Sequence, residues 1–176
     1  MIVLGIDPGA RFTGVALVDG TPSPLGCRDA KLLAHAVIEA GGDESEYFAA
    51  VGLGLVEIML DQGVTNLGLV ALEDVVAPSP HVRRKDGNSI IRPGTLIETA
   101  KVYGYVARWA AWADVELVPI APAGNGSQHL GTYPDELVAP GERRLKDWRF
   151  RLAGKSNPIN HARSAWDVAL AALIRL

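Results

Sequence analysis

Short apolar runs alternate along the chain with longer amphipathic segments. Residues 2–6 and 13–18 are apolar and rich in β-branched residues, and an Asp-Pro-Gly turn signal separates them, so they predict two strands. Residues 67–72 and 115–120 are continuous apolar runs, which are typical of strands covered on both faces. Residues 30–40 fit either a strand or a helix.

Three segments show helical periodicity. Residues 43–62 carry apolar side chains at helical spacing with acids near the start, which predicts an amphipathic helix. Residues 95–113 and 158–176 predict two further helices, and Pro158 suits the first turn of the last one. Residues 75–94 predict a long loop, whereas the pattern of 121–157 predicts no particular structure.

Strands that alternate with helices predict an α/β fold, with helices on both faces of a mixed sheet. The chain has 176 residues, of which 48% are hydrophobic, so we expect a single domain spanning 1–176. Cys27 is the only cysteine, which excludes an internal disulfide and favours a reducing compartment. The N-terminal apolar run is too short for a signal peptide, and no run approaches the roughly 20 apolar residues of a membrane span. These observations predict a cytoplasmic protein that does not bind membranes.

The net charge of −3 hides two basic blocks. Residues 81–108 contain six Lys and Arg against two Asp and Glu, and residues 142–163 contain seven against two. Such asymmetry allows a local basic face on an acidic protein, which nucleic acids would recognise. Two solvated loops would give the same pattern, and charge alone favours neither interpretation.

Three acids occupy positions suited to a common site. Asp7 directly follows the first strand, Glu73 ends the apolar run 67–72, and Asp167 lies on the last helix. Strand ends of open α/β sheets form sites at one edge, and clustered carboxylates repel one another unless a cation neutralises them. Oxygen ligands suit Mg²⁺ or Mn²⁺, and two such ions can clamp a phosphodiester under attack. Singly, Asp7 could cap a turn and Asp167 could be a surface residue, so the combination carries the prediction.

Three motifs resemble those of the RuvC Holliday junction resolvases. They are LGIDPGARFTGVALVD at 4–19, LGLVALEDV at 67–75 and SAWDVALAALIRL at 164–176. The first is fairly specific, and the other two gain weight from their order and spacing. The resemblance implies an RNase H-like fold, with a mixed five-stranded sheet flanked by helices on both faces.

The resemblance also implies metal ligands. Asp7, Glu73 and Asp167 match the family's ligand positions, and the fourth ligand position, one helical turn before the last, is occupied here by the neutral Ser164. Some relatives use His near this place, so His161 is a candidate ligand or proton carrier as well as a plain surface residue. A different register would place His161 and Ser164 at the family's paired positions and leave Asp167 one turn beyond; we favour it less. The implied cofactor is Mg²⁺ or Mn²⁺, with two ions per site.

Two departures bear on DNA specificity. Val76 stands where the family often places an aromatic wedge, and residues 122–130 lack the functional Lys that the family carries nearby. These differences question junction specificity more than nuclease chemistry, and they suggest a divergent, phage-type protein acting in the bacterial cytoplasm or in an infected host cell.

The basic blocks would flank the metal site and contact DNA phosphates. The expected DNA-binding residues are Arg83, Arg84, Lys85, Arg92, Arg143, Arg144, Lys146, Arg149 and Lys155. Trp148 could stack on a base, although a place in the core or in an interface is the favoured interpretation. Four aromatic residues of 95–113 could supply homodimer contacts, with internal packing favoured for at least half of them: Tyr103, Tyr105, Trp109 and Trp112.

The hypothesis is a homodimeric, metal-dependent endodeoxyribonuclease that cuts four-way DNA junctions in recombination and repair. One alternative is a broader nuclease for forks and flaps. Another is a catalytically inactive DNA-binding scaffold of the same fold, which Ser164 favours. An actin-like phosphotransferase is excluded because the chain is too short for two lobes.

Overall fold

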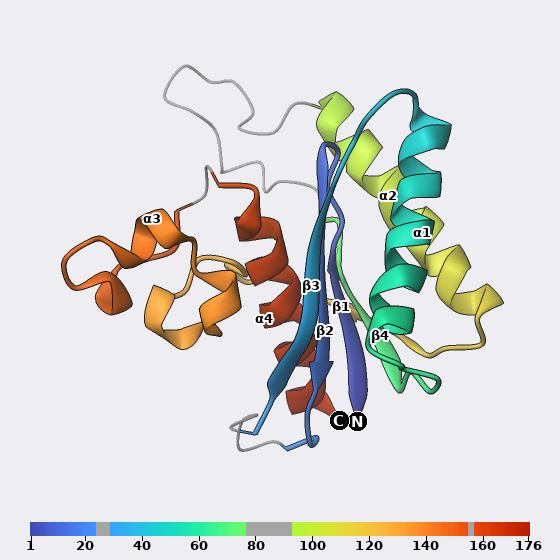
Figure 1. The fold of residues 1–176 in the computed structure, drawn as a ribbon. Coiled ribbons are helices and arrows are strands. Elements are labelled where there is room, and N and C mark those ends of the chain that lie inside the picture. Colours follow the sequence, from blue (N-terminus) through green and yellow to red (C-terminus); the bar gives the residue numbers. More distant parts are fainter. Residues whose placement is uncertain (24–28, 77–92, 155–156) are drawn as a thin grey trace.

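A five-stranded mixed sheet forms the centre of the computed structural model (Figure 1). The structure describes residues 1–23, 29–76, 93–154 and 157–176. The strand order is β3-β2-β1-β4-β5. The first three strands pair antiparallel, whereas β4 is parallel to β1 and β5 is parallel to β4. The strands are β1 (Ile2–Asp7), β2 (Phe12–Asp19), β3 (Lys31–Glu39), β4 (Leu69–Glu73) and β5 (Leu117–Ile120). The segment left open between strand and helix is therefore strand β3.

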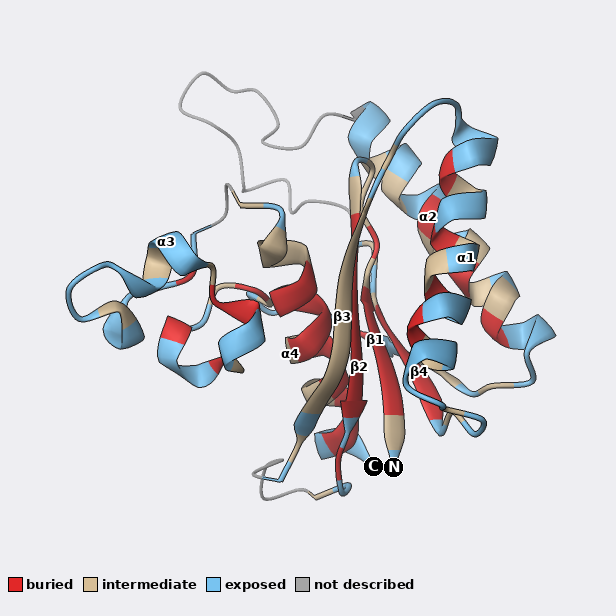
Figure 2. Cartoon of the chain, in the orientation of Figure 1, coloured by how far each residue is buried: buried red, intermediate tan, exposed pale blue. Residues whose placement is uncertain are grey.

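Helices cover both faces of the sheet, as the sequence predicts. α1 (Glu44–Asp61) and α2 (Pro93–Trp112) lie on one face, and α4 (Ile159–Arg175) lies on the other (Figure 1). The middle residues of β1, β2 and β4 are consequently buried on both sides (Figure 2). Two hydrophobic clusters form the core, one between the sheet and α4 and one beneath α1 and α2. No helix in the described part of the chain is long and apolar enough to cross a membrane.

The start of α1 is fixed by a capping box. Asp43 accepts a hydrogen bond from the Glu46 amide at 3.0 Å, and the Glu46 carboxylate accepts one from the Asp43 amide at 3.2 Å. This exchange satisfies amide groups that a helix terminus would otherwise leave unpaired. The predicted bounds 43–62 therefore differ from the observed helix only by its two capping residues.

Glycines allow α4 to approach the sheet closely. A Cβ added to Gly14 would lie 2.0 Å from the carbonyl oxygen of His161, and one added to Gly5 would lie 2.0 Å from that of Ala165. Gly14 is also the partner of Asp7 in the β1–β2 ladder. The first turn of α4 is therefore held against the end of β1, where the first candidate acid emerges.

The segment between β5 and α4 forms a lobe beside α4 (Figure 1). Its described residues form short helical turns, η1 (Leu130–Thr132), η2 (Asp135–Leu137), α3 (Pro140–Arg143) and η3 (Trp148–Phe150), and an isolated β-bridge joins His129 to Leu152. The fully buried Arg163 of α4 anchors the lobe, because its Nε donates to the Leu137 carbonyl at 2.7 Å and its guanidinium pairs with Glu142. Turns this short leave little periodicity, which is why the sequence pattern predicts no structure here.

Candidate metal centre

Two carboxyl groups emerge side by side at one edge of the sheet. Asp7 ends β1 and Glu73 ends β4, and these adjacent parallel strands pair Ile6 with Leu72 immediately before the two acids. Burial, followed by the charge and hydrogen bond of Asp7, raises the pKa of Glu73 to about 8. Two carboxylates this close cannot both ionise without a compensating charge, so the metal-free pair retains one proton near neutral pH.

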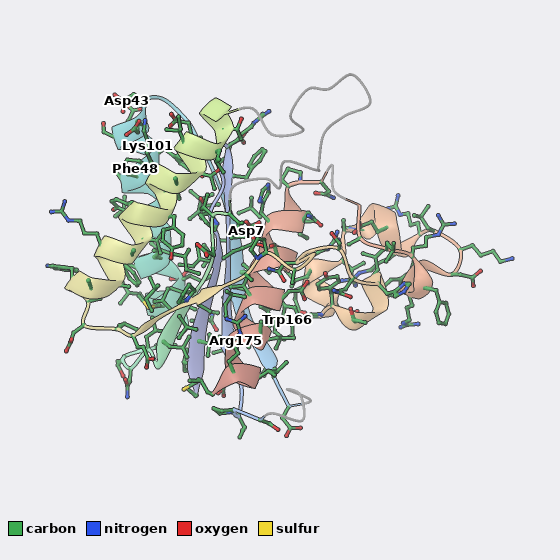
Figure 3. All side chains as sticks on the ribbon, turned by 180° about the vertical axis from the view of Figure 1, so that it is seen from behind. Asp7, Asp43, Phe48, Lys101, Trp166 and Arg175 are labelled. Atoms are coloured by element: carbon green, nitrogen blue, oxygen red, sulfur yellow. The ribbon has the colours of Figure 1, made fainter. Side chains whose placement is uncertain are left out.

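α4 supplies two further polar side chains to this pair. His161 Nδ1 lies 2.8 Å from Asp7 Oδ2, and Ser164 Oγ donates to Glu73 Oε2 at 3.1 Å. Figure 3 shows Asp7 beside the first turns of α4. Residues three apart share one face of a helix, so a single face presents both groups. The structure thus brings Asp7 and Glu73 together with His161 and Ser164, which is the arrangement of the less favoured register.

Asp167 lies one turn further along and has other partners. Its Oδ2 accepts hydrogen bonds from the Gly126 amide at 2.8 Å and from the Tyr133 hydroxyl at 2.9 Å. Burial raises its pKa, and these two hydrogen bonds oppose the rise. Within the described residues, no three His, Cys, Asp or Glu side chains are grouped so that they could hold a metal ion. The expected meeting of Asp167 with the other two acids is therefore not seen.

A glycine-bounded loop closes the site from the side of β5. Gly124 and Gly126 have positive φ angles of 79° and 72°, which glycine adopts without steric cost. Between them, Asn125 donates from Nδ2 to Glu73 Oε1 at 2.8 Å. Sequence reasoning missed Asn125 and Tyr133. Gly124 and Gly126 are compatible with a tight turn in the sequence, but no local pattern indicates that such a turn reaches the acids.

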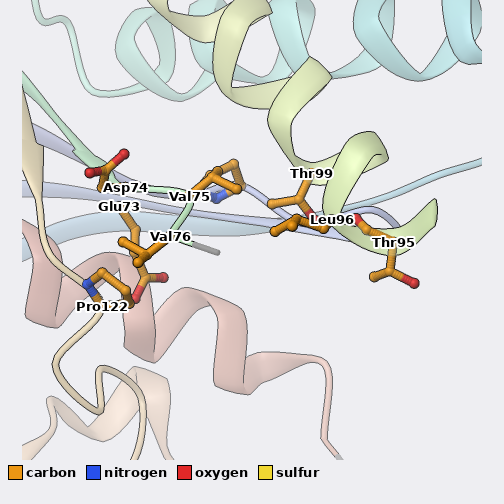
Figure 4. A pocket seen from close by; sticks show the side chains of 9 residues that line it. Glu73, Asp74, Val75, Val76, Thr95, Leu96, Thr99 and Pro122 are labelled. Carbon is orange, nitrogen blue, oxygen red and sulfur yellow. Dashed lines mark hydrogen bonds between the residues drawn. The ribbon is translucent and has the colours of Figure 1, made fainter. Parts of the chain in front are cut away.

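Two adjoining cavities meet at Glu73. A cleft of about 290 Å³ lies over the acids and contains no Lys or Arg among its described lining residues, which include Asp7, Asn125, Asn160 and Ser164. The second cavity, of about 340 Å³, lies between the end of β4 and the start of α2 (Figure 4). Val75, Val76, Leu96 and Pro122 supply much of its apolar wall. Glu73 and Pro122 line both cavities, so the carboxyl pair borders a polar cleft and a largely apolar one.

The donor set suits a hard divalent cation. Two carboxyl groups, an imidazole nitrogen and a hydroxyl oxygen converge, and no described Lys or Arg in the cleft balances the acids. A strongly raised carboxyl pKa in a cleft is a feature of functional sites, because keeping such a group at neutral pH costs folding free energy. Asp7 and Glu73 supply the two carboxyl groups of this set, His161 lies beside Asp7, and Ser164 is a weak neutral neighbour of Glu73.

The expected DNA-binding residues are divided by the structure. Arg143, Arg144, Lys146 and Arg149 are exposed on the lobe, whereas Arg83, Arg84, Lys85, Arg92 and Lys155 lie outside the described residues. Trp148 packs partly buried against the core, with the Arg149 guanidinium 4.8 Å from its ring centroid. Trp148 therefore takes the first of the two roles favoured for it, a place against the core rather than in an interface.

The aromatic residues of α2 are mostly internal. Tyr105 stacks on Phe48 with ring centroids 5.2 Å apart, and Tyr103 and Trp109 pack partly buried against the core. Trp112 is different, because 85% of its surface is exposed. Internal packing therefore holds for three of the four aromatics, as predicted for at least half.

No known protein-family model matches the sequence, and no curated protein sequence matches it either. Solved structures do match. The RuvC protein of Thermus thermophilus in complex with a Holliday junction substrate is 20% identical with a TM-score of 0.59, over 98% of this chain and 92% of that one. Thermus thermophilus RuvC in a second structure is 21% identical with a TM-score of 0.56, over 98% and 92%. The Fowlpox virus resolvase in complex with Holliday junction DNA is 13% identical with a TM-score of 0.52, over 98% and 97%. The chain thus has the RuvC-type, RNase H-like fold, and the predicted fold class is confirmed.

Proposed function

We propose that this chain is a metal-dependent endonuclease that cuts branched DNA, with the four-way junction as its substrate. The observation that carries the proposal is the Asp7–Glu73 pair, which ends two adjacent parallel strands and faces His161 and Ser164 of α4. The fold adds support, because a structure of similar fold from Thermus thermophilus and one from Fowlpox virus each contain a Holliday junction.

The metal would be held by Asp7 and Glu73, with His161 completing the set. Divalent ions bound there, predicted as two Mg²⁺ or Mn²⁺, would supply Lewis-acid stabilisation and a water molecule of lowered pKa. We adopt the register in which His161 and Ser164 face the acids, since both contact them directly. In this proposal Asp167 fixes the loop around Gly126 through its own hydrogen bonds, and Asn125 on that loop orients Glu73.

The protein would act as a homodimer. A four-way junction has two-fold symmetry, so two cuts related by that symmetry need two sites related in the same way. The exposed Trp112 at the end of α2 is the most accessible aromatic residue available for contacts between copies.

A second candidate function is a DNA-binding scaffold without activity. Ser164 favours it, because a neutral hydroxyl occupies the helix position nearest Glu73 and leaves that side of the site without a third carboxylate.

Cleavage of a synthetic four-way junction with Mg²⁺ or Mn²⁺ tests both candidates. We expect paired symmetric nicks from the wild type, loss of at least about a hundredfold in rate for Asp7→Asn, and wild-type rates for the control Asp61→Asn, an exposed acid ending α1. Binding without cleavage in either metal would select the scaffold, and cleavage gained in Ser164→Asp would then identify the missing group. Cleavage of flaps and forks but not junctions would select the broader nuclease.

A further inference from the structure

An apolar tip projects from the lobe between β5 and α4. Phe150 is 80% exposed and Leu152 is 64% exposed, although both belong to a short segment of otherwise charged residues. Apolar side chains left in water lose the free energy that burial would provide, and a surface that exposes several of them together is a candidate for contact with a partner.

The surroundings of Phe150 carry a positive charge. Residues 139–152 contain five Arg and Lys against two Asp and Glu. One of the two acids, Glu142, is already paired with the buried Arg163. The side chains of Arg144 and Lys146 are exposed and make no hydrogen bond or ion pair with the rest of the described chain, so both charges remain available to an anionic partner.

Hydrogen bonds hold the backbone of the tip in place. The Phe150 carbonyl lies 2.8 Å from His129 Nδ1, and the Phe150 amide donates to the Asp147 carbonyl at 3.0 Å. On the other side, the Leu130 amide donates to the Arg151 carbonyl at 2.8 Å. A ring carried on a backbone held in this way costs less conformational entropy to bind than a ring on a mobile loop.

The same backbone connects the tip to the metal centre. The segment that contacts Phe150 and Arg151 continues directly from the loop whose Asn125 contacts Glu73. Tyr133 links the two further, because its hydroxyl accepts a hydrogen bond from the Gln128 amide at 3.1 Å and donates one to Asp167 at 2.9 Å. The backbone that carries Phe150 is therefore connected to the metal centre through these hydrogen bonds.

We propose that Phe150 stacks on an unpaired base of branched DNA while Arg144 and Lys146 contact the adjacent phosphates. This inference rests on the proposed function. The partner is a polyanion because the surrounding charge is positive, and the aromatic ring selects exposed bases because paired bases inside a duplex are already stacked. In this way the lobe distinguishes branched DNA from fully paired DNA at the carboxyl pair.

The test uses a junction with the fluorescent base 2-aminopurine at its branch point, bound by the wild type without divalent metal. We expect the wild type to change the fluorescence, Phe150→Ala to abolish the change and weaken junction binding about tenfold, and Phe150→Trp to retain both. Leu53→Ala is the matched control, since Leu53 is 62% exposed on α1. Binding of a fully paired duplex of equal length should be the same for all four proteins.

An unchanged signal and affinity in Phe150→Ala, with a melting temperature equal to that of the wild type, would overturn the inference. So would a change in oligomeric state by sedimentation, which would assign the tip to contact between copies of the chain. Cleavage is measured separately with metal present. A wild type that does not cut contradicts the proposed function, whereas a Phe150→Ala variant that binds like the wild type contradicts only the base-stacking role.

Discussion

At the scale of single residues, the raised pKa of Glu73 makes the metal-free protein sensitive to pH. Its pKa rises from 4.5 to about 8, mainly through burial and the neighbouring Asp7. The folded state therefore binds this proton more tightly than the unfolded state, and the resulting stability is present below pH 4.5 and is lost as the pH rises toward about 8. Asp167, whose pKa is also raised, adds a further decline in the same direction.

We therefore expect the melting temperature of the metal-free protein to fall by at least about 4 °C between pH 5 and pH 9, which corresponds to about 1–2 kcal/mol for a domain of this size. Glu73→Gln should reduce this decline, because it removes the shared proton. Added Mg²⁺ should restore the melting temperature of the wild type at pH 9, because an ion that binds the folded state stabilises that state. It should not restore the melting temperature of the variant. The measurement is thermal unfolding followed by circular dichroism. An equally steep decline in Glu73→Gln would show that other groups govern the pH dependence.

Some residues of the site could be predicted from the sequence and others could not. Asp7 and Glu73 could be predicted, because the end of a strand determines where its last side chain emerges from the sheet. His161, Ser164 and Asp167 lie on one stripe of a helix, so choosing among them requires the rotation of α4 about its axis, which packing against the sheet determines. Asn125 and Tyr133 reach the acids only through tertiary contacts that no local pattern encodes.

At the scale of elements, the packing of α4 against β1 and β2 determines which helical residues face the acids. Gly14 allows this contact, because a Cβ there would lie 2.0 Å from the His161 carbonyl oxygen, a backbone atom that cannot rotate away. The predicted strands and helices agree closely with the observed ones, since their periodicities are long enough to read. The glycines that set the distance between α4 and the sheet cannot be recognised in the sequence, because they look like any other glycine in a strand.

Gly14→Ala should push α4 away from the sheet. We expect a loss of about 1–3 kcal/mol in the free energy of unfolding from overpacking, measured by urea denaturation. Displacement of His161 from Asp7 should also lower the metal affinity, measured by titration calorimetry. Gly104→Ala in α2 is the matched control: nothing lies within 4 Å of its Cβ position, so it should leave metal binding unchanged and gain up to about 1 kcal/mol from helix propensity. A Gly14→Ala variant with wild-type stability would contradict this account of the contact.

At the scale of the whole molecule, the distribution of charge matters more than its sum. The chain carries a net charge of −3, yet exposed cations gather on the lobe beside α4 while the carboxyl pair lies at the sheet edge. The alternation of strands and helices predicted the α/β architecture, because each element shows its own periodicity. It did not predict that residues 139–152 form part of a compact lobe, since turns of three or four residues have no period to read.

The lobe's contribution to DNA binding can be measured through salt. Each phosphate neutralised by Lys or Arg adds about 0.9 to the slope of log K against log salt concentration, because binding releases condensed counterions. We expect the double variant Arg144→Gln/Lys146→Gln to bind a four-way junction more weakly at low salt and to flatten that slope by roughly 2, measured by fluorescence anisotropy across a salt series. The control Lys31→Gln/Arg108→Gln removes the same net charge from two exposed residues, at the start of β3 and on α2. If the control flattened the slope equally, the effect would come from the net charge of the protein, and the lobe would have no specific role in holding the DNA.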